Sequence, residues 1–374
     1  MSYSFVFHGN LQYAELSKKE IPEIIKRSYI PTIDFLLKNE IKFALNITGY
    51  TLQYLPDGLI EKIREGVEDG LIELTGTSYT HAILPLLELD RVAEQIRKDK
   101  EKKEEVFGIE PKTFWLPELA YDPVIPGILK KEGYEEVYVD GEAVLFSDIE
   151  NTAKKNIEPT TPHLYKAQRN EGIRFINYLL GLREAKKAVR DSFSGKVRLD
   201  AVEDIVGIPV WTAVNNSVMM ALADLPLMSV DKVARWISGL DELMLYGMDI
   251  EFMGYRKLGG NELQLEKLGE LISRVGTDIV LPSELKLSDR KSYLRTSSWT
   301  PDKSLDIWRE DEDNRRLNML SRGMSGKKAY LAENSDARGW EPIPERKLDA
   351  FEAVYEDWEQ HHSSQEGEDV TKKT

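Results

Sequence analysis

The chain of 374 residues contains no cysteine. Disulfide bonds, thiolate nucleophiles and thiolate metal sites are therefore excluded. Long apolar runs are also missing, because none approaches the ~18 residues that a membrane-spanning helix needs. The opening stretch "MSYSFVFHGNLQ" lacks the basic flank and the cleavage site of a signal peptide. We therefore expect a cytoplasmic protein that does not insert into a membrane.

Several catalytic motifs are absent as well. No GxxxxGK[ST] phosphate loop, no GxGxxG after the first apolar run and no GxSxG nucleophile elbow occurs. The histidines are few and form neither an HExxH nor an HxxxH pair; they are His8, His81, His163, His361 and His362. This pattern disfavours nucleotide-dependent, serine-dependent and metal-dependent hydrolysis. We expect no cofactor and no metal, which argues against a metal-dependent carbohydrate deacetylase.

The balance of charge excludes another set of partners. Lys and Arg number 50 against 65 Asp and Glu, which gives a formal net charge of −15. Such an acidic chain is not typical of proteins that bind nucleic acid or anionic membranes. A neutral or cationic ligand fits better, and the chain is compatible with a homo-oligomer. Abundant Glu, Lys and Arg without cysteine also fits a thermophile.

Apolar strand-like runs recur with helical segments between them. Helical patterning covers residues 19–40 and 88–108, for example. Parallel strands need such crossover helices, and strands covered by helices on both faces read as continuous apolar runs. The repetition predicts an α/β fold, either a (β/α)7 barrel or a doubly wound open sheet, and its number of units favours the barrel. The predicted strands are 3–8, 42–48, 71–77, 112–118, 135–140, 204–211 and 243–252.

The pattern changes after residue 260. Helical segments dominate there, at 262–276 and 345–362. We predict a catalytic barrel at 1–260, a mainly helical C-terminal region packed on it at 261–362, and a polar, disordered tail at 363–374.

Polar side chains follow the predicted strands one after another. In a β/α barrel the carboxyl ends of the strands meet at one rim, which carries the functional groups. The candidates at that rim include two acids, Glu118 after the fourth strand and Asp249 in the seventh. Histidine and tryptophan accompany them at His8, His81, Trp115 and Trp211, and Glu251 follows Asp249.

Two carboxylates with aromatic neighbours point to glycoside hydrolysis. One acid attacks the anomeric carbon or activates water, and the other protonates the leaving oxygen. The carboxyl groups lie roughly 5 to 5.5 Å apart in retaining enzymes and roughly 6.5 to 9.5 Å apart in inverting ones. Each residue alone is more often structural: an acid after a strand commonly caps a helix, and a lone histidine or tryptophan is commonly core. Their joint placement on one rim is what favours catalysis.

Five short stretches occur in a recognisable order. They are "FHGNLQYAE", "TGTSYTHAILP", "FWLPELAYDP", "YGMDIEF" and "AENSDARGW". Together they resemble glycoside hydrolase family 57, over nearly the whole chain from Phe7 to Trp340. The resemblance implies a (β/α)7 barrel followed by a helical region. It also implies a retaining mechanism without a metal.

Residue roles follow from the same resemblance. Glu118, in the W-x-P-E stretch, is the expected nucleophile, and Asp249, in the D-x-E stretch, is the expected general acid and base. The expected wall of the sugar subsite consists of His8, His81, Trp115 and Glu251, with Trp211 and Trp340 as further contributors.

The substrate is the remaining question. The opening "FHGNLQYAE" most resembles the archaeal α-galactosidase branch of the family, whereas its α-glucan branches usually begin with H-Q-P. We therefore expect an α-galactosidase acting on an oligosaccharide or α-glycoside. An α-amylase or 4-α-glucanotransferase is the alternative within the family. A sugar-binding protein without catalysis is the alternative outside it.

Overall fold

A computed structural model gives the fold of the chain. It describes residues 2–147, 195–199, 205–225, 228–238, 240, 242–258, 260–275, 278–300, 302–339 and 342–370. Within these residues, no helix is both long enough and apolar enough to pass through a bilayer.

Seven parallel strands close into a barrel, because β8 pairs with both β7 and β1. The closure confirms the barrel and rules out the open sheet. All seven predicted strands are present. In spatial order they are β1 (Ser2–Gly9), β2 (Phe43–Ile47), β3 (Ile72–Gly76), β4 (Thr113–Trp115), β5 (Glu136–Asp140), β7 (Val206–Val210) and β8 (Leu243–Asp249).

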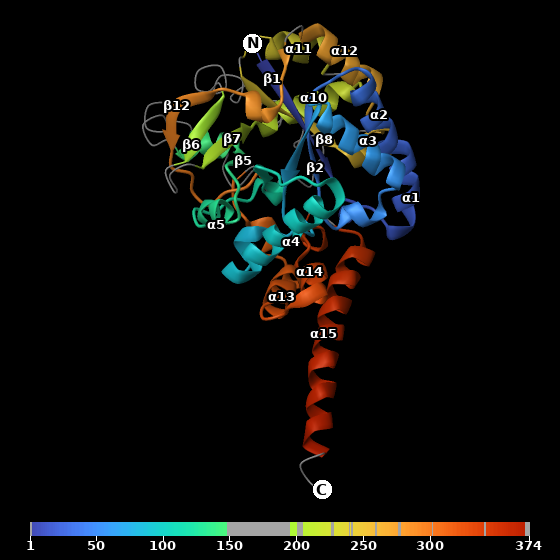
Figure 1. The fold of residues 1–374 in the computed structure, drawn as a ribbon, viewed down its shortest axis with the longest axis vertical. Helices are drawn as coiled ribbons and strands as arrows, with labels where there is room; N and C mark the ends of the chain where they lie inside the picture. Colours follow the sequence, from blue (N-terminus) through green and yellow to red (C-terminus); the bar gives the residue numbers. More distant parts are fainter. Residues whose placement is uncertain are drawn as a thin grey trace.

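Helices connect the strands and cover the outside of the barrel (Figure 1). The first connection combines α1 (Ile21–Ile24), a π-helical turn (Ile25–Tyr29) and α2 (Ile30–Lys38). Prolines stand in the first turns of both α1 and α2, where the missing N–H costs no hydrogen bond. The others are α3 (Asp57–Glu68), α4 (Leu89–Phe107), α5 (Ile125–Lys131), α6 (Gly141–Ser147), α10 (Thr212–Leu222), α11 (Val230–Ile237) and α12 (Leu265–Val275).

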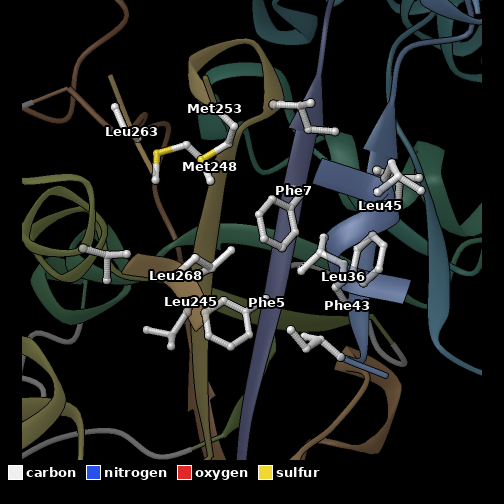
Figure 2. Close-up of a cluster of buried hydrophobic side chains, with 14 of the residues drawn as sticks. Phe5, Phe7, Leu36, Phe43, Leu45, Leu245, Met248, Met253, Leu263 and Leu268 are labelled. Atoms are coloured by element: carbon white, nitrogen blue, oxygen red, sulfur yellow. The ribbon is translucent and has the colours of Figure 1, made fainter. Parts of the chain in front are cut away.

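Side chains of β1 alternate between the two faces of the barrel wall. Phe5 and Phe7 point outward into the layer between strands and helices, where they lie near Phe43 of β2 and Leu245 of β8 (Figure 2). Val6 belongs to a separate cluster that fills the barrel interior. Because a strand has a period of two residues, His8 at the end of β1 shares the inner face with Val6.

The segment after residue 260 contributes strands as well as helices. β11 (Asp278–Ile279) pairs with β1, and β12 (Leu287–Ser292) pairs with β6 (Lys196–Leu199), which runs antiparallel to β7. The predicted boundary at 260 is therefore crossed by strand pairing. A short hairpin of β9 (Lys257–Leu258) and β10 (Asn261–Glu262) also spans it.

The last helices lie beneath the barrel. α13 (Glu312–Leu320) and α14 (Gly326–Glu333) pack with α15 (Pro344–Val370), which projects away from the body (Figure 1). α15 ends at Val370, and the disordered tail expected from residue 363 onward stays a prediction. No proline follows Pro344 to stop the helix.

Candidate active site

The site lies at the mouth of the barrel, which we define as the carboxyl ends of its strands with the loops that follow them. Glu118 stands in a short 3₁₀ turn (Pro117–Leu119) after β4, three residues beyond the strand end at Trp115. Its backbone is left-handed (φ 58°), as is that of Leu119 (φ 46°). Such strain in non-glycine residues is typical of functional sites. About 22% of the Glu118 side chain is exposed, so its carboxylate opens to the mouth.

His81 is the nearest cationic neighbour of Glu118. Its Nδ1 lies 4.0 Å from Oε1 of Glu118 and 3.6 Å from Oδ2 of Asp336, and it shares a 2.8 Å hydrogen bond with Oγ of Ser335. The backbone of His81 is also left-handed, at φ 57°. Its Nε2 is buried and has no hydrogen-bond partner among the described residues, which leaves that nitrogen for a ligand.

His8 lies beside His81, as the sequence predicted for residues on one rim. The two imidazole rings are 4.6 Å apart, and the ring of His8 stacks on Trp115 at 6.1 Å. The side-chain nitrogen Nδ2 of Asn46, on β2, forms a 3.0 Å hydrogen bond with Nδ1 of His8. Trp115 is buried inside the barrel, where it also packs on Tyr138. His8 and Trp115 thus form the floor of the mouth.

A β-bulge turns Asp249 into the mouth. On β8, Leu243 and Leu245 point into the outer layer, so strict alternation would send Asp249 outward too. Val6 pairs with Tyr246 and Phe7 with Met248, so the register shifts there. β8 therefore carries one extra residue at this point, and Asp249 comes into register with His8 on the inner face. Bulges commonly re-aim side chains next to active sites.

Glu251 lies deeper than a subsite wall requires. It is completely buried, and its Oε1 accepts a 2.7 Å hydrogen bond from the N–H of Asn10 and another from the Tyr29 hydroxyl. Its Oε2 has no partner among the described residues. Glu251 thereby fixes the loop after β1, and sugar contact through it remains a prediction.

Asp336 and Asn10 are site residues that the sequence interpretation did not assign. The side-chain N–H of Asn10 donates to Oδ2 of Asp336 at 2.5 Å, and the N–H of Ala14 donates to Oδ1 at 3.0 Å. Asp336 is buried in the turn Ser335–Ala337, which follows α14. The available signal was its place in "AENSDARGW", one of the stretches that carry the resemblance. The contact between Asn10 and Asp336 cannot be inferred from periodicity, because the two residues are 326 positions apart in the sequence.

The two remaining tryptophans were less certain members of the predicted subsite. Trp211 follows β7, but its ring is buried in the outer layer and packs against Gly141. A sugar contact from Trp211 stays a prediction. Trp340 lies outside the described residues.

The protonation of the mouth follows from burial and from these contacts. Burial raises the pKa of Glu118, although the nearby His81 and the Trp299 hydrogen bond oppose it. Burial alone would lower the pKa of His81, but Asp336, Glu118 and Asp249 outweigh it, and the pKa is raised. The pKa of His8 lies well below its usual value because of burial and of the charge on His81. One imidazole therefore favours its cationic form and the other its neutral form.

Glu251, a second buried acid, has a strongly raised pKa. Burial and the neighbouring charge of Asp249 raise the pKa of Glu251 to about 8. Near neutral pH, Glu251 is therefore mainly a neutral carboxylic acid. Repulsion among the clustered acids is reduced, which lets Glu118 and Asp249 share one mouth.

The arrangement matches the requirements of acid-assisted displacement at a neutral ligand. Glu118 is a partly exposed acid beside an imidazole whose pKa is raised, and Asp249 comes from another strand and contributes to raising the pKa of the same imidazole. Two buried polar atoms of the mouth, Nε2 of His81 and Oε2 of Glu251, have no hydrogen-bond partner among the described residues.

Comparison with known proteins agrees with this arrangement. The sequence model of Glycosyl hydrolase family 57 matches residues 5–294, which include both acids. The chain is 38% identical over 139 residues to the 1,4-alpha-glucan branching enzyme TK1436 of Thermococcus kodakarensis, covering 33% of this chain and 20% of that protein. It is 30% identical over 125 residues to Alpha-amylase 1 of Dictyoglomus thermophilum, covering 32% and 18%. The chain thus matches about a fifth of the length of these curated relatives.

Solved structures share the fold. The 4-alpha-glucanotransferase from Thermococcus litoralis superposes with a TM-score of 0.66 at 13% identity, covering 96% of this chain and 58% of that one. The branching enzyme TK1436 gives a TM-score of 0.63 at 16% identity, covering 95% and 88%. Because the family model extends over most of the barrel and the fold agrees, the chain belongs to glycosyl hydrolase family 57.

Proposed function

We propose that the protein is a retaining α-glycoside-acting enzyme in which Glu118 is the nucleophile and Asp249 is the general acid and base. One observation carries the proposal: the two acids come from β4 and β8, on different sides of the barrel, and both influence the charge of His81 at the mouth. Glu118 is held in a strained turn, and Asp249 is turned inward by a bulge.

The first step forms a glycosyl-enzyme ester. An oxygen of the Glu118 carboxylate attacks the anomeric carbon while the bond from that carbon to the leaving oxygen breaks. Asp249 gives its proton to that oxygen. The pKa of His81 is raised, which favours a positive charge beside Glu118, and that charge stabilises the carboxylate before attack.

The second step releases the sugar. Asp249, now ionised, removes a proton from water or from the hydroxyl of an acceptor sugar, which attacks the anomeric carbon and expels Glu118. Two inversions at one carbon retain the α configuration. The acceptor decides whether the outcome is hydrolysis or transfer.

We propose an α-glucan as the substrate. The relatives named above are a branching enzyme, an α-amylase and a 4-α-glucanotransferase, which favours this reading over the α-galactosidase predicted from the sequence. The floor formed by His8 and Trp115 offers aromatic surface to a sugar ring, and Nε2 of His81 offers a polar contact to a hydroxyl.

An α-galactoside is the second candidate, and the loop after β1 favours it. Here the chain has His8-Gly9-Asn10 instead of H-Q-P, and Asn10 joins the loop to Asp336 and Glu251. Glucose and galactose differ in the orientation of the hydroxyl at C4. A changed polar loop at the mouth is one way to change that selection.

A substrate panel separates the candidates. Wild-type protein is incubated with maltotriose and longer maltooligosaccharides, and separately with p-nitrophenyl-α-galactoside; products are followed by chromatography and by nitrophenol release. Shortened or redistributed glucans support the α-glucan proposal. Nitrophenol release without action on the glucans supports the α-galactosidase instead.

The nucleophile-deficient Glu118→Ala variant is the control for the same panel. Its inactivity shows that any products come from this site and not from a contaminant. Failure of the wild-type protein on every α-glycoside, at temperatures up to its unfolding transition, would overturn the proposed function.

A further inference from the structure

A loop after β12 covers one side of the mouth. We call it the strap and define it as residues 297–300 and 302–305. Its start is tied to the segment after β4, because Ser297 and Tyr121 exchange two backbone hydrogen bonds of 2.8 and 3.0 Å. Thr296, just before the strap, donates to Asp122 at 2.8 Å. The strap therefore runs alongside the turn that carries Glu118.

The strap holds Glu118 through both its backbone and its side chain. The N–H of Trp299 donates to the carbonyl oxygen of Glu118 at 3.2 Å. The indole Nε1–H of Trp299 donates to Oε2 of the same residue. Oε1 instead faces His81. The two carboxylate oxygens therefore have different partners, a neutral donor on one and an imidazole on the other.

The far end of the strap is fixed by a buried cation. Nζ of Lys303 lies 3.0 Å from Oδ1 of Asp140 and 2.6 Å from Oε2 of Glu142. Asp140 is fully buried at the carboxyl end of β5, where its Oδ2 also accepts a 3.0 Å hydrogen bond from Thr212. Lys303 has a left-handed backbone (φ 59°), and its side chain is only 14% exposed. The ion pair is thus well shielded from solvent.

Internal hydrogen bonds connect the two ends of the strap. The N–H of Ser298 donates to the carbonyl of Lys303 at 3.2 Å, and the N–H of Lys303 donates to the carbonyl of Thr300 at 2.9 Å. These bonds close a turn that contains Trp299, so a displacement of Lys303 would also displace Trp299. A rigid turn anchored at both ends can hold a donor on one chosen oxygen.

We propose that Trp299 is a positioning residue that fixes Oε2 of Glu118 and leaves Oε1 to attack, and that the Lys303–Asp140 pair anchors it. The proposal rests on the proposed function. During attack the bond from Oε1 to the anomeric carbon forms, and the bond from that carbon to the leaving oxygen breaks. The leaving oxygen keeps the electron pair of that bond and accepts the proton of Asp249. Oε2 becomes the carbonyl oxygen of the ester and keeps the indole N–H as its donor.

The first test replaces the donor and keeps an aromatic ring. In Trp299→Phe, kcat falls about 10- to 100-fold, the loss expected when a carboxylate loses a hydrogen bond, while KM changes little. The acidic limb of the pH–rate profile moves to higher pH, because a donor to the charged form lowers a carboxyl pKa and its removal raises it. Trp358→Phe, on the exposed face of α15, is the matched control and keeps wild-type rates.

A second readout does not depend on turnover. The Glu118 carboxyl is followed by NMR in protein labelled at the glutamate carboxyl carbon, with the signal assigned by its loss in Glu118→Gln. Its titration midpoint moves to higher pH in Trp299→Phe but not in Trp358→Phe. An unchanged midpoint overturns the proposal, whether or not the protein turns over the sugars tested. Inactivity of wild-type protein on the panel is the separate failure of the proposed function.

The anchor is tested at Lys303. Lys303→Met disconnects the strap from Asp140, so its pH profile and NMR midpoint should shift in the same direction as those of Trp299→Phe. Lys303→Arg keeps the cation and should restore most of the wild-type behaviour. Wild-type behaviour of Lys303→Met would overturn the anchoring role and leave Trp299 acting alone.

Discussion

Two groups of buried charge in this molecule are built in opposite ways. One is the pair of Asp99 and Lys103 on α4, both fully buried and joined at 2.6 Å. The other is the mouth, where Glu118, His81 and Glu251 gather at the ends of different strands. Both lie in the same barrel, so the contrast between them separates charge used for folding from charge used for chemistry.

Asp99 of the α4 pair has a donor on each of its carboxylate oxygens. Asp99 accepts the N–H of Gly49 at 2.7 Å and that of Thr77 at 2.9 Å, in addition to Lys103. These bonds join the loops after β2 and β3. Gly49 is required here, because a Cβ would lie 2.8 Å from the ring of Tyr79. The pair therefore organises the loop that leads to His81.

In the mouth, some buried polar atoms lack hydrogen-bond partners among the described residues. Oε2 of Glu251 and Nε2 of His81 are buried without a partner among the described residues. The backbone is left-handed at His81 and at Glu118. Buried polar groups are otherwise nearly always satisfied. Unpartnered buried hydroxyls and left-handed residues also occur elsewhere in the described residues. What distinguishes the mouth is that they coincide there with ionisable side chains from different strands, whereas the charges on α4 neutralise each other locally.

The largest effect is expected from removing the nucleophile. Glu118→Ala should lower turnover on the order of 10⁵-fold, as loss of a covalent nucleophile does in other enzymes. Its free energy of unfolding should change little, because the carboxylate is partly exposed and strained. Azide should restore turnover by entering the vacated β face, and the product should be the β-azide. Wild-type activity in Glu118→Ala would refute the assignment; Glu65→Ala, on the exposed face of α3, is the control.

The next effect concerns the proton donor. Asp249→Ala should slow substrates with sugar leaving groups about 10²- to 10⁴-fold, which is the usual contribution of general acid catalysis. For substrates that release nitrophenol, the rate of the first step should fall less, because nitrophenolate leaves without needing a proton. The measurement compares kcat/KM for the two leaving groups. Equal losses for both would contradict the role of Asp249 as the acid.

The free energy of unfolding should depend more on the α4 pair than on the residues of the mouth. Lys103→Met leaves Asp99 buried without its cation, and should cost about 3–5 kcal/mol of unfolding free energy. The measurement is urea unfolding followed by circular dichroism. The double variant Asp99→Asn with Lys103→Met removes both charges and should lose much less. A double variant as unstable as the single one would show that the attraction itself, not the orphaned charge, matters.

The succession of strands, and the position of Glu118 just after one of them, could be predicted from the sequence because they depend on local signals, whereas the catalytic roles of Glu118 and Asp249 stay predictions. Continuous apolar runs mark buried parallel strands, and Glu118 directly follows one of them. The C-terminal boundary was harder, because β11 and β12 are short and polar and are strands only through their pairing with β1 and β6. Their pairing partners are far away in the sequence, and composition carries no record of them.

The bulge in β8 and the strap show a second kind of limit. Strict alternation along "LMLYGMD" would point Asp249 away from the mouth, and only the register against β1 reveals the extra residue. Trp299 stands in a stretch with no helical or strand periodicity, and its partner Glu118 precedes it by 181 residues. Long-range contacts of this kind position the chemistry but leave no local pattern.

The smallest effect should be a change of slope in stability against pH. The pKa of Glu251 is raised from its ordinary value of 4.5 to about 8 when the chain folds. Between these values the folded state holds a proton that the unfolded state has lost, so the free energy of unfolding falls as pH rises through this window. Glu251→Gln removes the titration and should flatten the fall by about 1 kcal/mol per pH unit.

The measurement is urea unfolding at pH 5 and at pH 8, with Glu65→Gln as the exposed control. The glutamine keeps an oxygen for the donors Asn10 and Tyr29, so the two proteins should be nearly equally stable at pH 5. At pH 8 the variant should be the more stable one. A wild-type slope in Glu251→Gln would mean that another group takes up the proton. The mouth would then not keep a neutral acid beside Asp249, and the contrast with the α4 pair would rest on hydrogen bonding and backbone strain alone.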